Sequence, residues 1–320
     1  MSACPERSRG SLGHVTPSTT PLRSLALSRG TVDRAAHHRT DQRWLADRWD
    51  DPSTRVLVVD GGTARVAGDP PALVLVPPGG APPTKPDERW FLGLDDDETA
   101  LFAVVGDLAW HTRTATLRQV GALLGGRDAG LLTTAVALEA WHATHRHCPT
   151  CGAPTDVAEG GAVRVCPVDG SLQHPRVDPA VIMAVVDDDD RLLLGHQARW
   201  PANRFSTLAG FVEPGESLEQ AVAREVLEET GIVVTSSTYL GSQPWPFPRS
   251  LMLGFISRAA TTEISEDRVE IMEARWFTRA DLARALGAGQ VLLPPRVSIA
   301  RRLIERWHGD RLQDPVADRW

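Results

Sequence analysis

The sequence predicts an α+β protein of several domains, and three observations support this fold class. Short apolar stretches alternate with turn residues along most of the chain, three of the four cysteines cluster near its middle, and an amphipathic helical pattern follows in the second half. The length of 320 residues leaves room for two or three domains with cores of their own. We therefore expect two α+β domains joined by a small cysteine-bearing module.

The charge and the apolar content of the chain exclude some classes of protein. Lys and Arg number 34 and Asp and Glu 41, a formal charge of -7, whereas proteins that recognise DNA sequence normally carry a basic face. The longest apolar run, Ala180–Val186, falls well short of the roughly 20 residues that cross a bilayer and predicts a buried strand instead. Four cysteines are too few for a disulfide framework, which favours a reducing compartment. We expect a soluble cytoplasmic protein with no membrane partner.

The first part of the chain predicts a tail followed by an α+β domain. Residues 1–21 are rich in Ser, Pro, Arg and Thr and lack an apolar segment, which favours a disordered tail over a transit peptide. In residues 22–145, Gly, Pro and Asp clusters separate strand-like stretches, and helical spacing appears near the end. The predicted strands are Arg55–Asp60, Ala72–Val76, Trp90–Leu94 and Ala100–Val105, with a loop at Pro77–Pro86 and helices at Ala115–Leu124 and Asp128–His145.

Residues 146–177 predict a zinc-binding module. Two cysteines, Cys148 and Cys151, precede Cys166 and Asp169 with the C-x2-C-x14-C-x2-C spacing of a zinc ribbon, except that the last cysteine is an aspartate. Structural zinc takes four ligands in a tetrahedron, and a carboxylate oxygen is an allowed though less usual ligand. His147 and His174 are alternative fourth ligands, and a metal-free module held by packing is the alternative to zinc.

Residues 178–312 predict a second α+β domain. Strands and helices alternate here, and the acidic run Asp187–Asp190 predicts a solvated hairpin turn. Besides a helix that begins at Ser217, the predicted elements are strands at Val181–Val186, Arg191–Gly195, Thr238–Leu240 and Leu251–Ser257 and a C-terminal helix at Pro295–Trp307.

The helix that begins at Ser217 carries carboxylates on the stripe that starts as its buried face. Ser217 and Gln220 form a capping box, and Gly231 stands where a left-handed residue ends a helix. Clustered carboxylates repel one another, and a hard divalent cation such as Mg²⁺ or Mn²⁺ relieves that repulsion. An exposed, glutamate-rich surface helix is the alternative. On a 3.6-residue period the stripe runs through Leu218, Val222, Glu225 and Glu229, with Glu228 beside it and Arg224 placed to pair with Glu216.

The spacing Gly210-x5-Glu216-x7-Arg224-Glu225-Val226-x-Glu228-Glu229-x-Gly231-Ile232 resembles the complete Nudix box. Members of the Nudix superfamily hydrolyse nucleoside diphosphates linked to another moiety. The resemblance implies an α/β/α sandwich with a mixed sheet for the C-terminal domain. It also implies Glu225 and Glu229 as Mg²⁺ or Mn²⁺ ligands, Glu228 as a further ligand or a base, and Arg224 and Glu216 as part of the catalytic machinery.

A proline-rich stretch, Ser242–Ser250, follows the helix. Its alternating prolines predict an extended backbone from which Trp245 and Phe247 project to the same side and offer their rings to a flat ligand. A rigid turn with core aromatics is the alternative. After a Nudix box, Ser-Gln-Pro-Trp-Pro-Phe-Pro-x-Ser resembles the signature of the NADH pyrophosphatase branch, the NudC-type enzymes.

This second resemblance implies an activity. NudC-type enzymes cleave NAD(H) to nicotinamide mononucleotide and AMP, and bacterial members remove NAD caps from RNA 5′ ends. NAD-cap removal as the main role, a broader ADP-ribose or dinucleotide pyrophosphatase, and a non-catalytic NAD sensor are the alternatives. The resemblance further implies a homodimer whose active site is built across two subunits, with structural zinc besides the catalytic Mg²⁺ or Mn²⁺.

The resemblance also assigns residues to the substrate and the catalytic metal. The carbonyl of Ala209 and the carboxylate of Glu270 would join Glu225 and Glu229 around the metal. Two departures stand in the ribbon, where His174 replaces the usual tyrosine and Gly161 an acid. The implied substrate contacts are Phe211, Gln243, Pro244, Trp245, Pro246, Phe247, Pro248, Arg249, Ser250, Ala300, Arg118 and His174.

Overall fold

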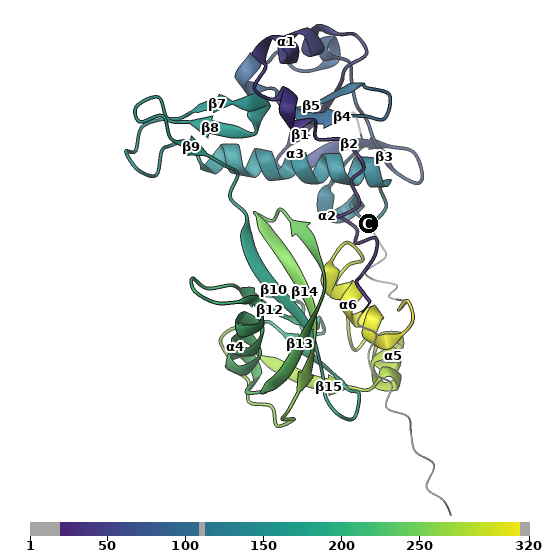
Figure 1. Cartoon of the computed structure of the whole chain (residues 1–320). Coiled ribbons are helices and arrows are strands. Elements are labelled where there is room, and N and C mark those ends of the chain that lie inside the picture. The colour runs from purple at the N-terminus through teal and green to yellow at the C-terminus, as the bar shows by residue number, and fades with distance from the viewer. Residues whose placement is uncertain (1–19, 109–112, 314–320) are drawn as a thin grey trace, which may run out of the picture.

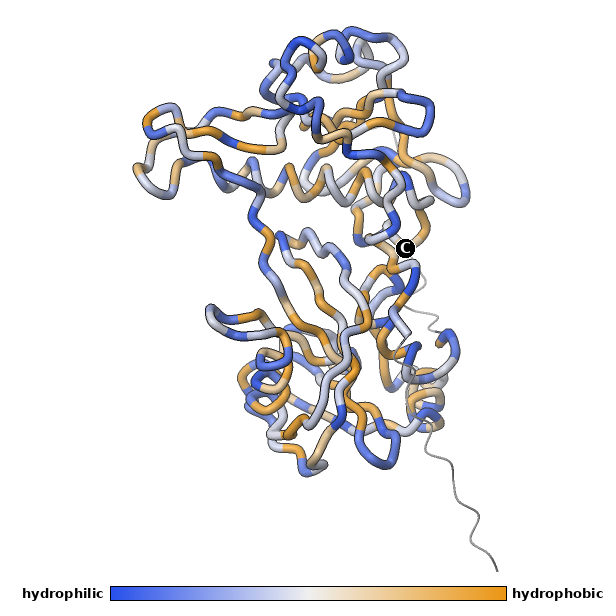
Figure 2. Tube along the Cα trace, in the orientation of Figure 1, coloured by the Kyte–Doolittle hydropathy of each residue, from blue (hydrophilic) through white to orange (hydrophobic). Residues whose placement is uncertain are grey.

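The computed structural model describes residues 20–108 and 113–313, which form an upper N-terminal domain, a lateral ribbon and a lower C-terminal domain (Figure 1). Residues 1–19 of the predicted tail lie outside these ranges. Apolar residues concentrate along the strands of both large sheets, and hydrophilic residues along the peripheral loops (Figure 2). Among the described residues, no helix has the length and apolarity needed to span a membrane.

The N-terminal domain is a six-stranded sheet with a helix on each face. The strand order is β3-β2-β1-β5-β4, with β6 paired to β2, and only β1 and β5 run parallel. Leu57 and Val59 of β1 pack under α3, while Val56 and Val58 pack under α1, because successive side chains of a strand point to opposite faces. The elements are α1 (Gln42–Asp50), β1 (Arg55–Asp60), β2 (Thr63–Ala67), β3 (Ala72–Leu73), β4 (Trp90–Leu94), β5 (Ala100–Val105), β6 (Thr114–Thr116), α2 (Leu117–Val120), α3 (Gly126–Thr144) and the 3₁₀ turns η1 (Ala36–His38), η2 (Pro78–Gly80) and η3 (Pro86–Glu88).

Two predictions for this domain are wrong in part. The helix expected at Ala115–Leu124 is only the short α2, because Thr114–Thr116 pairs with β2 as a strand and the side chain of Thr116 caps the helix that follows. The strand expected at Ala72–Val76 ends at Leu73, and Val76 pairs separately with Val56 of β1. The long helix α3 begins two residues before the predicted Asp128.

The ribbon packs against the N-terminal domain through a buried histidine. Nδ1 of His142, on α3, accepts from Nη1 of Arg164 (3.1 Å), so Nε2 carries the proton and donates to the carbonyl of Gly161 (3.0 Å). The imidazole also stacks on Trp90, at 4.9 Å between ring centroids. These contacts hold the ribbon on α3. The ribbon comprises the antiparallel strands β7 (Asp156–Ala158), β8 (Val163–Val165) and β9 (Leu172–Gln173) and the turn η4 (Glu159–Gly161).

The C-terminal domain is the α/β/α sandwich that the resemblance implied. Its strand order is β13-β14-β10-β11-β15, with β12 paired to β10, and the sheet is mixed because β10 and β14 are parallel. Val222 and Val226 of α4 pack on one face of the sheet, and α5 and α6 cover the other. The elements are β10 (Asp178–Val186), β11 (Leu192–His196), β12 (Leu208–Phe211), α4 (Leu218–Thr230), β13 (Val234–Trp245), β14 (Ser250–Ala259), β15 (Glu273–Phe277), α5 (Arg279–Gly287) and α6 (Ile299–His308).

Three local expectations for this domain need correction. The strands predicted at Thr238–Leu240 and Leu251–Ser257 are the cores of the much longer β13 and β14. The C-terminal helix begins at Ile299 rather than Pro295, because the side chain of Ser298 caps it. In the acidic turn Asp187–Asp190, the first residue is buried and paired with Nε of Arg191 (2.7 Å) rather than solvated.

The start of the described chain joins the two domains. Leu22 donates through its backbone N–H to the carbonyl of Leu240 in β13, and Leu25 lies in the core beneath α6. Leu27 already belongs to the core of the N-terminal domain. The segment therefore crosses from one domain to the other beside α6, as the first coloured part of the trace in Figure 1 shows.

Candidate functional site

The glutamate helix α4 has the ends that the sequence predicts. The hydroxyl of Ser217 accepts from the N–H of Gln220, and the side chain of Gln220 accepts from the N–H of Ser217. Gly231 ends the helix in the left-handed conformation (φ 71°), which a glycine adopts without steric cost. With both ends fixed, Glu225, Glu228 and Glu229 lie on the last two turns.

An arginine ties the loop before α4 to the helix. Arg224 binds both carboxylate oxygens of Glu216, through Nε (2.6 Å) and Nη2 (2.9 Å), and donates to the carbonyl of Phe211 (2.9 Å). The charge-assisted hydrogen bonds from Arg224 lower the pKa of Glu216 to about 2. The loop 211–216 is therefore held on the helix by a planar, two-point contact.

Glu229 is the most unusual carboxylate of the group. Its side chain is 3% exposed, and neither carboxylate oxygen has a hydrogen-bond partner among the described residues. Burial raises the pKa of Glu229 to about 8, and the nearby charges of Glu225 and Glu270 add to the effect. Buried carboxylates without a partner are costly, so this arrangement suits a site that a cation completes.

Glu225 lies against β12. An ideal Cβ on Gly210 would fall 1.8 Å from Cδ of Glu225, so only glycine leaves room for the carboxylate at this position. Nη1 of Arg224 pairs with Oε1 of Glu225 at 2.9 Å. Burial raises the pKa of Glu225 despite that pairing, and Glu228 and Glu270 contribute in the same direction.

The other two carboxylates of the predicted set are more exposed. Glu228 accepts from Nη1 of Arg224 at 3.1 Å. Glu270 stands on a loop that one aspartate organises, since the carboxylate of Asp267 accepts from the backbone N–H groups of Val269, Glu270 and Ile271. No motif indicates this role of Asp267, although an aspartate that accepts from the backbone N–H two residues on is a common turn former.

Glu225, Glu228 and Glu270 line a cleft of about 760 Å³. Phe211 stands at its rim with 58% of its surface exposed, and Arg199 lies on its wall, a residue that no motif had indicated. Of the residues predicted for catalysis, metal or substrate, the cleft is lined by Ala209, Phe211, Arg224, Glu225, Glu228, Ser250 and Glu270.

A smaller chamber of about 190 Å³, the inner chamber, continues from the cleft. It shares Gln197, Arg199, Ala209 and Met252 with the cleft. Three residues predicted for metal or substrate line only the chamber: Glu229, Trp245 and Ala300. The cleft and the chamber thus bring together predicted residues from five separate stretches of the sequence.

The predicted extended conformation of the proline-rich stretch holds for Ser242–Trp245, which belong to β13, and is wrong for residues 246–249. β13 ends at Trp245, which pairs with Ser250 of β14, so Pro246, Phe247, Pro248 and Arg249 form the turn of a hairpin. The N–H of Phe247 donates to the carbonyl of Trp245 (2.7 Å). The two rings still lie together, edge to face, at 4.9 Å between centroids.

Several predicted substrate residues have other contacts in this chain. Gln243 is completely buried: its Oε1 accepts from the N–H of Leu27 (3.3 Å), and its Nε2 donates to the carbonyl of Val297 (2.9 Å). Arg249 pairs with Asp178 (2.9 Å). Gln243 therefore joins the two domains, and Arg249 joins the hairpin to the start of β10.

Three other predicted substrate contacts, His174, Arg118 and Pro244, lie outside both cavities. His174 is exposed and lines neither the cleft nor the chamber. The guanidinium of Arg118, on α2, lies over the rings of Phe247 (3.9 Å) and Trp245 (5.1 Å). Pro244 lines a separate crevice beside α3.

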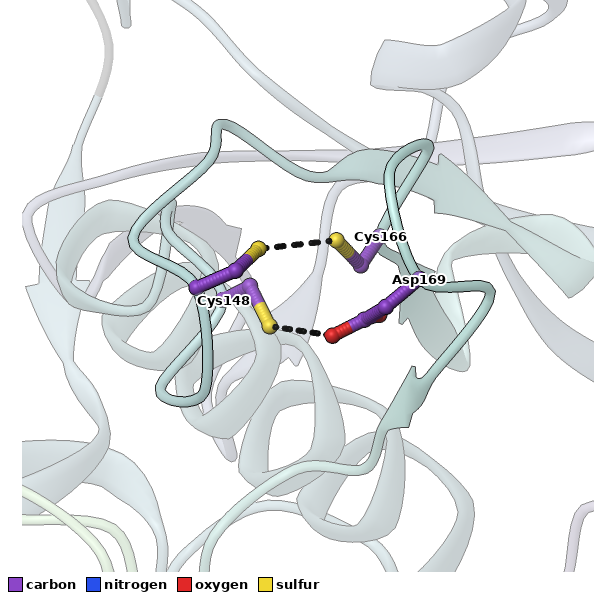
Figure 3. Close-up of side chains that lie close together, drawn as sticks. Cys148, Cys166 and Asp169 are labelled. Atoms are coloured by element: carbon purple, nitrogen blue, oxygen red, sulfur yellow. Dashed lines mark hydrogen bonds between the residues drawn. The ribbon is translucent and has the colours of Figure 1, made fainter.

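The ribbon carries a separate cluster with the donor set of a zinc site. One ligand atom from each of Cys148, Cys151, Cys166 and Asp169 lies within 4.8 Å of the others. Sγ of Cys151 lies 3.5 Å from Sγ of Cys166, and Sγ of Cys148 lies 3.6 Å from Oδ2 of Asp169 (Figure 3). Neither alternative ligand, His147 or His174, belongs to this cluster. Three thiols and a carboxylate fit a tetrahedral zinc ion.

Comparisons with known proteins give matches for both the C-terminal domain and the ribbon. The NUDIX domain family matches residues 176–296, and the NADH pyrophosphatase zinc ribbon domain family matches residues 143–173. The chain is 41% identical over 313 residues to "NAD-capped RNA hydrolase NudC" of Mycobacterium tuberculosis (strain ATCC 25618 / H37Rv), covering 89% of this chain and 96% of that protein. It is 44% identical over 193 residues to "NAD-capped RNA hydrolase NUDT12" of Homo sapiens, covering 57% of this chain and 42% of that protein.

Proposed function

The chain belongs to the NADH pyrophosphatase branch of the Nudix hydrolases, the NudC type, and we propose that it hydrolyses the pyrophosphate bond of NAD(H) to nicotinamide mononucleotide and AMP. The observation that carries this proposal is the buried carboxylate of Glu229. It has no partner among the described residues and lies close enough to Glu225 and Glu270 for their charges to raise its pKa. A buried carboxylate of this kind lowers the stability of the folded protein unless a cation binds it.

We assign the catalytic metal to Glu225, Glu229, Glu270 and the carbonyl of Ala209. The donors are all oxygen, which suits Mg²⁺ or Mn²⁺ rather than a softer metal. When bound, a divalent ion supplies positive charge that offsets the charge of the substrate phosphates and of the leaving phosphate. The hydrogen bonds that Asp267 accepts from its loop hold Glu270 at the wall of the cleft.

Side chains of the protein carry out proton transfer and substrate positioning. Glu228 is exposed on the wall of the cleft and is our candidate for the base that takes a proton from the attacking water. The water attacks one phosphorus as the bond to the bridging oxygen breaks. Arg224 holds the loop 211–216 on α4, and Phe211 at the rim offers a face for stacking on a base.

Product analysis tests this function. Wild-type protein with NADH and Mg²⁺ or Mn²⁺ should release AMP and reduced nicotinamide mononucleotide, and chelation of the metal should stop the reaction. Glu229→Gln keeps the size of the side chain and should lower kcat by more than about 100-fold, beyond the loss typical of an outer-shell partner of a metal. Full activity in Glu229→Gln, or wild-type turnover in excess chelator, would contradict the proposal.

A second candidate substrate is NAD-capped RNA. The names of the NudC and NUDT12 relatives favour it, and the 41% identity extends over almost the entire length of the mycobacterial protein. Comparing kcat/KM for NADH, NAD⁺, ADP-ribose and NAD-capped RNA would rank the alternatives. Binding of NAD without any product would instead support a sensor.

We further propose structural zinc at Cys148, Cys151, Cys166 and Asp169. The clustering of their ligand atoms supports it, and the free thiols suit a reducing compartment such as the cytoplasm. The expected result is one zinc per chain by elemental analysis. A chain that is folded and free of zinc after expression in zinc-supplied cells would overturn this assignment.

We also propose a homodimer. Phe211 and His174 are both exposed in the single chain, and in the expected dimer they would meet across two subunits around one base. Light scattering of the purified protein measures the oligomeric state, and a monomer with full activity would refute a shared site.

A further inference from the structure

The hairpin between β13 and β14 reaches out of the C-terminal domain and contacts the N-terminal domain. Trp245 and Phe247 at its end pack against the hydrophobic core beneath α3. The backbone of the hairpin has its own anchor two residues earlier, where the buried Gln243 binds Leu27 and Val297. The hairpin thus has an anchor that does not involve Arg118.

Arg118 acts on the rings rather than on the backbone. Its guanidinium lies 3.9 Å from the ring centroid of Phe247 and 5.1 Å from that of Trp245, within the distance at which a cation is attracted by an aromatic face. Partial burial lowers the pKa of Arg118, as expected for a guanidinium covered by rings. The side chain comes from α2, which the capping box of Thr116 and Gln119 fixes at its start.

Trp245 connects this contact to the catalytic centre. The same residue lines the inner chamber together with Glu229 and Ala300. A change in the orientation of the indole would therefore change the shape of the chamber in which the buried carboxylate lies.

We propose that Arg118 is a positioning residue for the reaction: from the N-terminal domain it holds the indole of Trp245 in the orientation that shapes the inner chamber for the substrate. This gives the N-terminal domain a role in substrate binding that it exerts through the hairpin. The inference rests on the proposed function, because the chamber is taken as part of the substrate site.

A double-mutant cycle on NADH hydrolysis tests the inference. Arg118→Leu removes the stacked cation and should raise KM about tenfold, equivalent to about 1.4 kcal/mol, with a smaller effect on kcat. If Arg118 acts through the indole, the same substitution in a Trp245→Leu background should change KM by less than about twofold. Arg118→Lys keeps the charge and should restore part of the loss.

A matched arginine provides the control. Arg89 lies over Trp49 at 4.2 Å in the same domain, and neither residue lines the cleft or the chamber. Arg89→Leu should leave KM and kcat at wild-type values. An Arg118→Leu effect that persists in full without Trp245 would indicate direct contact with the substrate and would overturn the inference, as would a wild-type KM in Arg118→Leu.

A measurement that needs no activity separates the inference from the proposed function. In protein labelled with 5-fluorotryptophan, the resonance of Trp245 is assigned by its loss in Trp245→Phe. Arg118→Leu should shift or broaden that fluorine signal, whereas Arg89→Leu should not. An unchanged signal would refute the positioning role even if no substrate were turned over, while an inactive wild-type protein would refute the proposed function alone.

Discussion

The carboxylate of Glu225 occupies the space in which a side chain of Gly210 would begin, with an ideal Cβ only 1.8 Å from Cδ of the glutamate. The first glycine of the Nudix box is thereby explained by contact rather than by backbone conformation. The strand β12 and the helix α4 approach so closely here that the carboxylate of Glu225, a proposed metal ligand, lies against the backbone of Gly210.

Gly210→Ala should therefore reduce activity by displacing Glu225. Forcing a methyl group into a filled site costs about 1–3 kcal/mol in stability, and the cheapest relief is a shift of the Glu225 side chain. We expect kcat to fall at least about tenfold, with weaker Mn²⁺ binding by calorimetry. Gly287→Ala is the control, since a Cβ there meets nothing within 4 Å. Wild-type metal affinity in Gly210→Ala would show that Glu225 is not a ligand.

The raised pKa of Glu229 predicts that the metal-free protein loses stability as the pH rises. Its pKa is raised from the ordinary glutamate value of 4.5 to about 8 in the folded protein. Between these values the folded state binds more protons than the unfolded state, so the free energy of unfolding falls with increasing pH across this window. Thermal unfolding in chelator at pH 5.5 and 8 measures the effect, at about 1–2 °C per kcal/mol for a chain of 320 residues.

Glu229→Gln should flatten this dependence and make the metal-free protein more stable than wild type at pH 8. Added Mg²⁺ or Mn²⁺ should raise the wild-type melting temperature at pH 8 and leave the variant nearly unchanged. Equal slopes in the two proteins would mean that Glu229 is not the group responsible.

Arg224→Lys should impair catalysis without changing the charge. Lysine cannot make the planar two-point contact with Glu216 or reach the carbonyl of Phe211 at the same time. We expect kcat/KM to fall about 10–100-fold, the range typical for partners that orient a metal ligand. Arg284→Lys, in an exposed pair with Asp281, should have no effect. Steady-state kinetics on NADH compare the two, and equal activities would contradict the role of Arg224.

Asp169→Ala should lower the zinc content and the melting temperature of the ribbon. Without the carboxylate only three protein ligands remain, too few for a closed structural site. His147→Ala and His174→Ala should keep full zinc content because neither histidine belongs to the cluster. Elemental analysis measures the zinc content of each variant. Loss of zinc in His174→Ala but not in Asp169→Ala would make His174, rather than Asp169, the fourth ligand.

Features fixed by short-range chemistry could be predicted from the sequence. The capping box at Ser217 and the left-handed Gly231 placed α4, and helical spacing gathered its glutamates. The cysteine spacing indicated which side chains of the ribbon form the candidate ligand cluster. Local sequence signals gave wrong predictions where pairing with another strand determines the backbone conformation. The prolines at 246 and 248 restrict φ, yet the pairing of Trp245 with Ser250 turns the stretch into a hairpin.

The remaining features depend on the packing of the two domains. Nothing near Arg118 in the sequence indicates Trp245 and Phe247, and nothing near Gln243 indicates Leu27 or Val297. The predictions that placed Gln243 and Arg249 against substrate came from a motif, and a motif does not specify where each of its side chains points. Arg199 belongs to no pattern at all and becomes visible only as part of the cleft.

The path of residues 20–28 limits how this protein can be divided. Leu25 fills part of the core beneath α6, and Leu22 extends the hydrogen bonding of β13, although both precede the N-terminal domain in the chain. A fragment that starts at residue 178 would lack these side chains and leave unfilled space in the core to which Leu240 and Ile299 belong. Truncated forms of the enzyme should therefore retain residues 20–28, either in the same chain or as an added synthetic peptide.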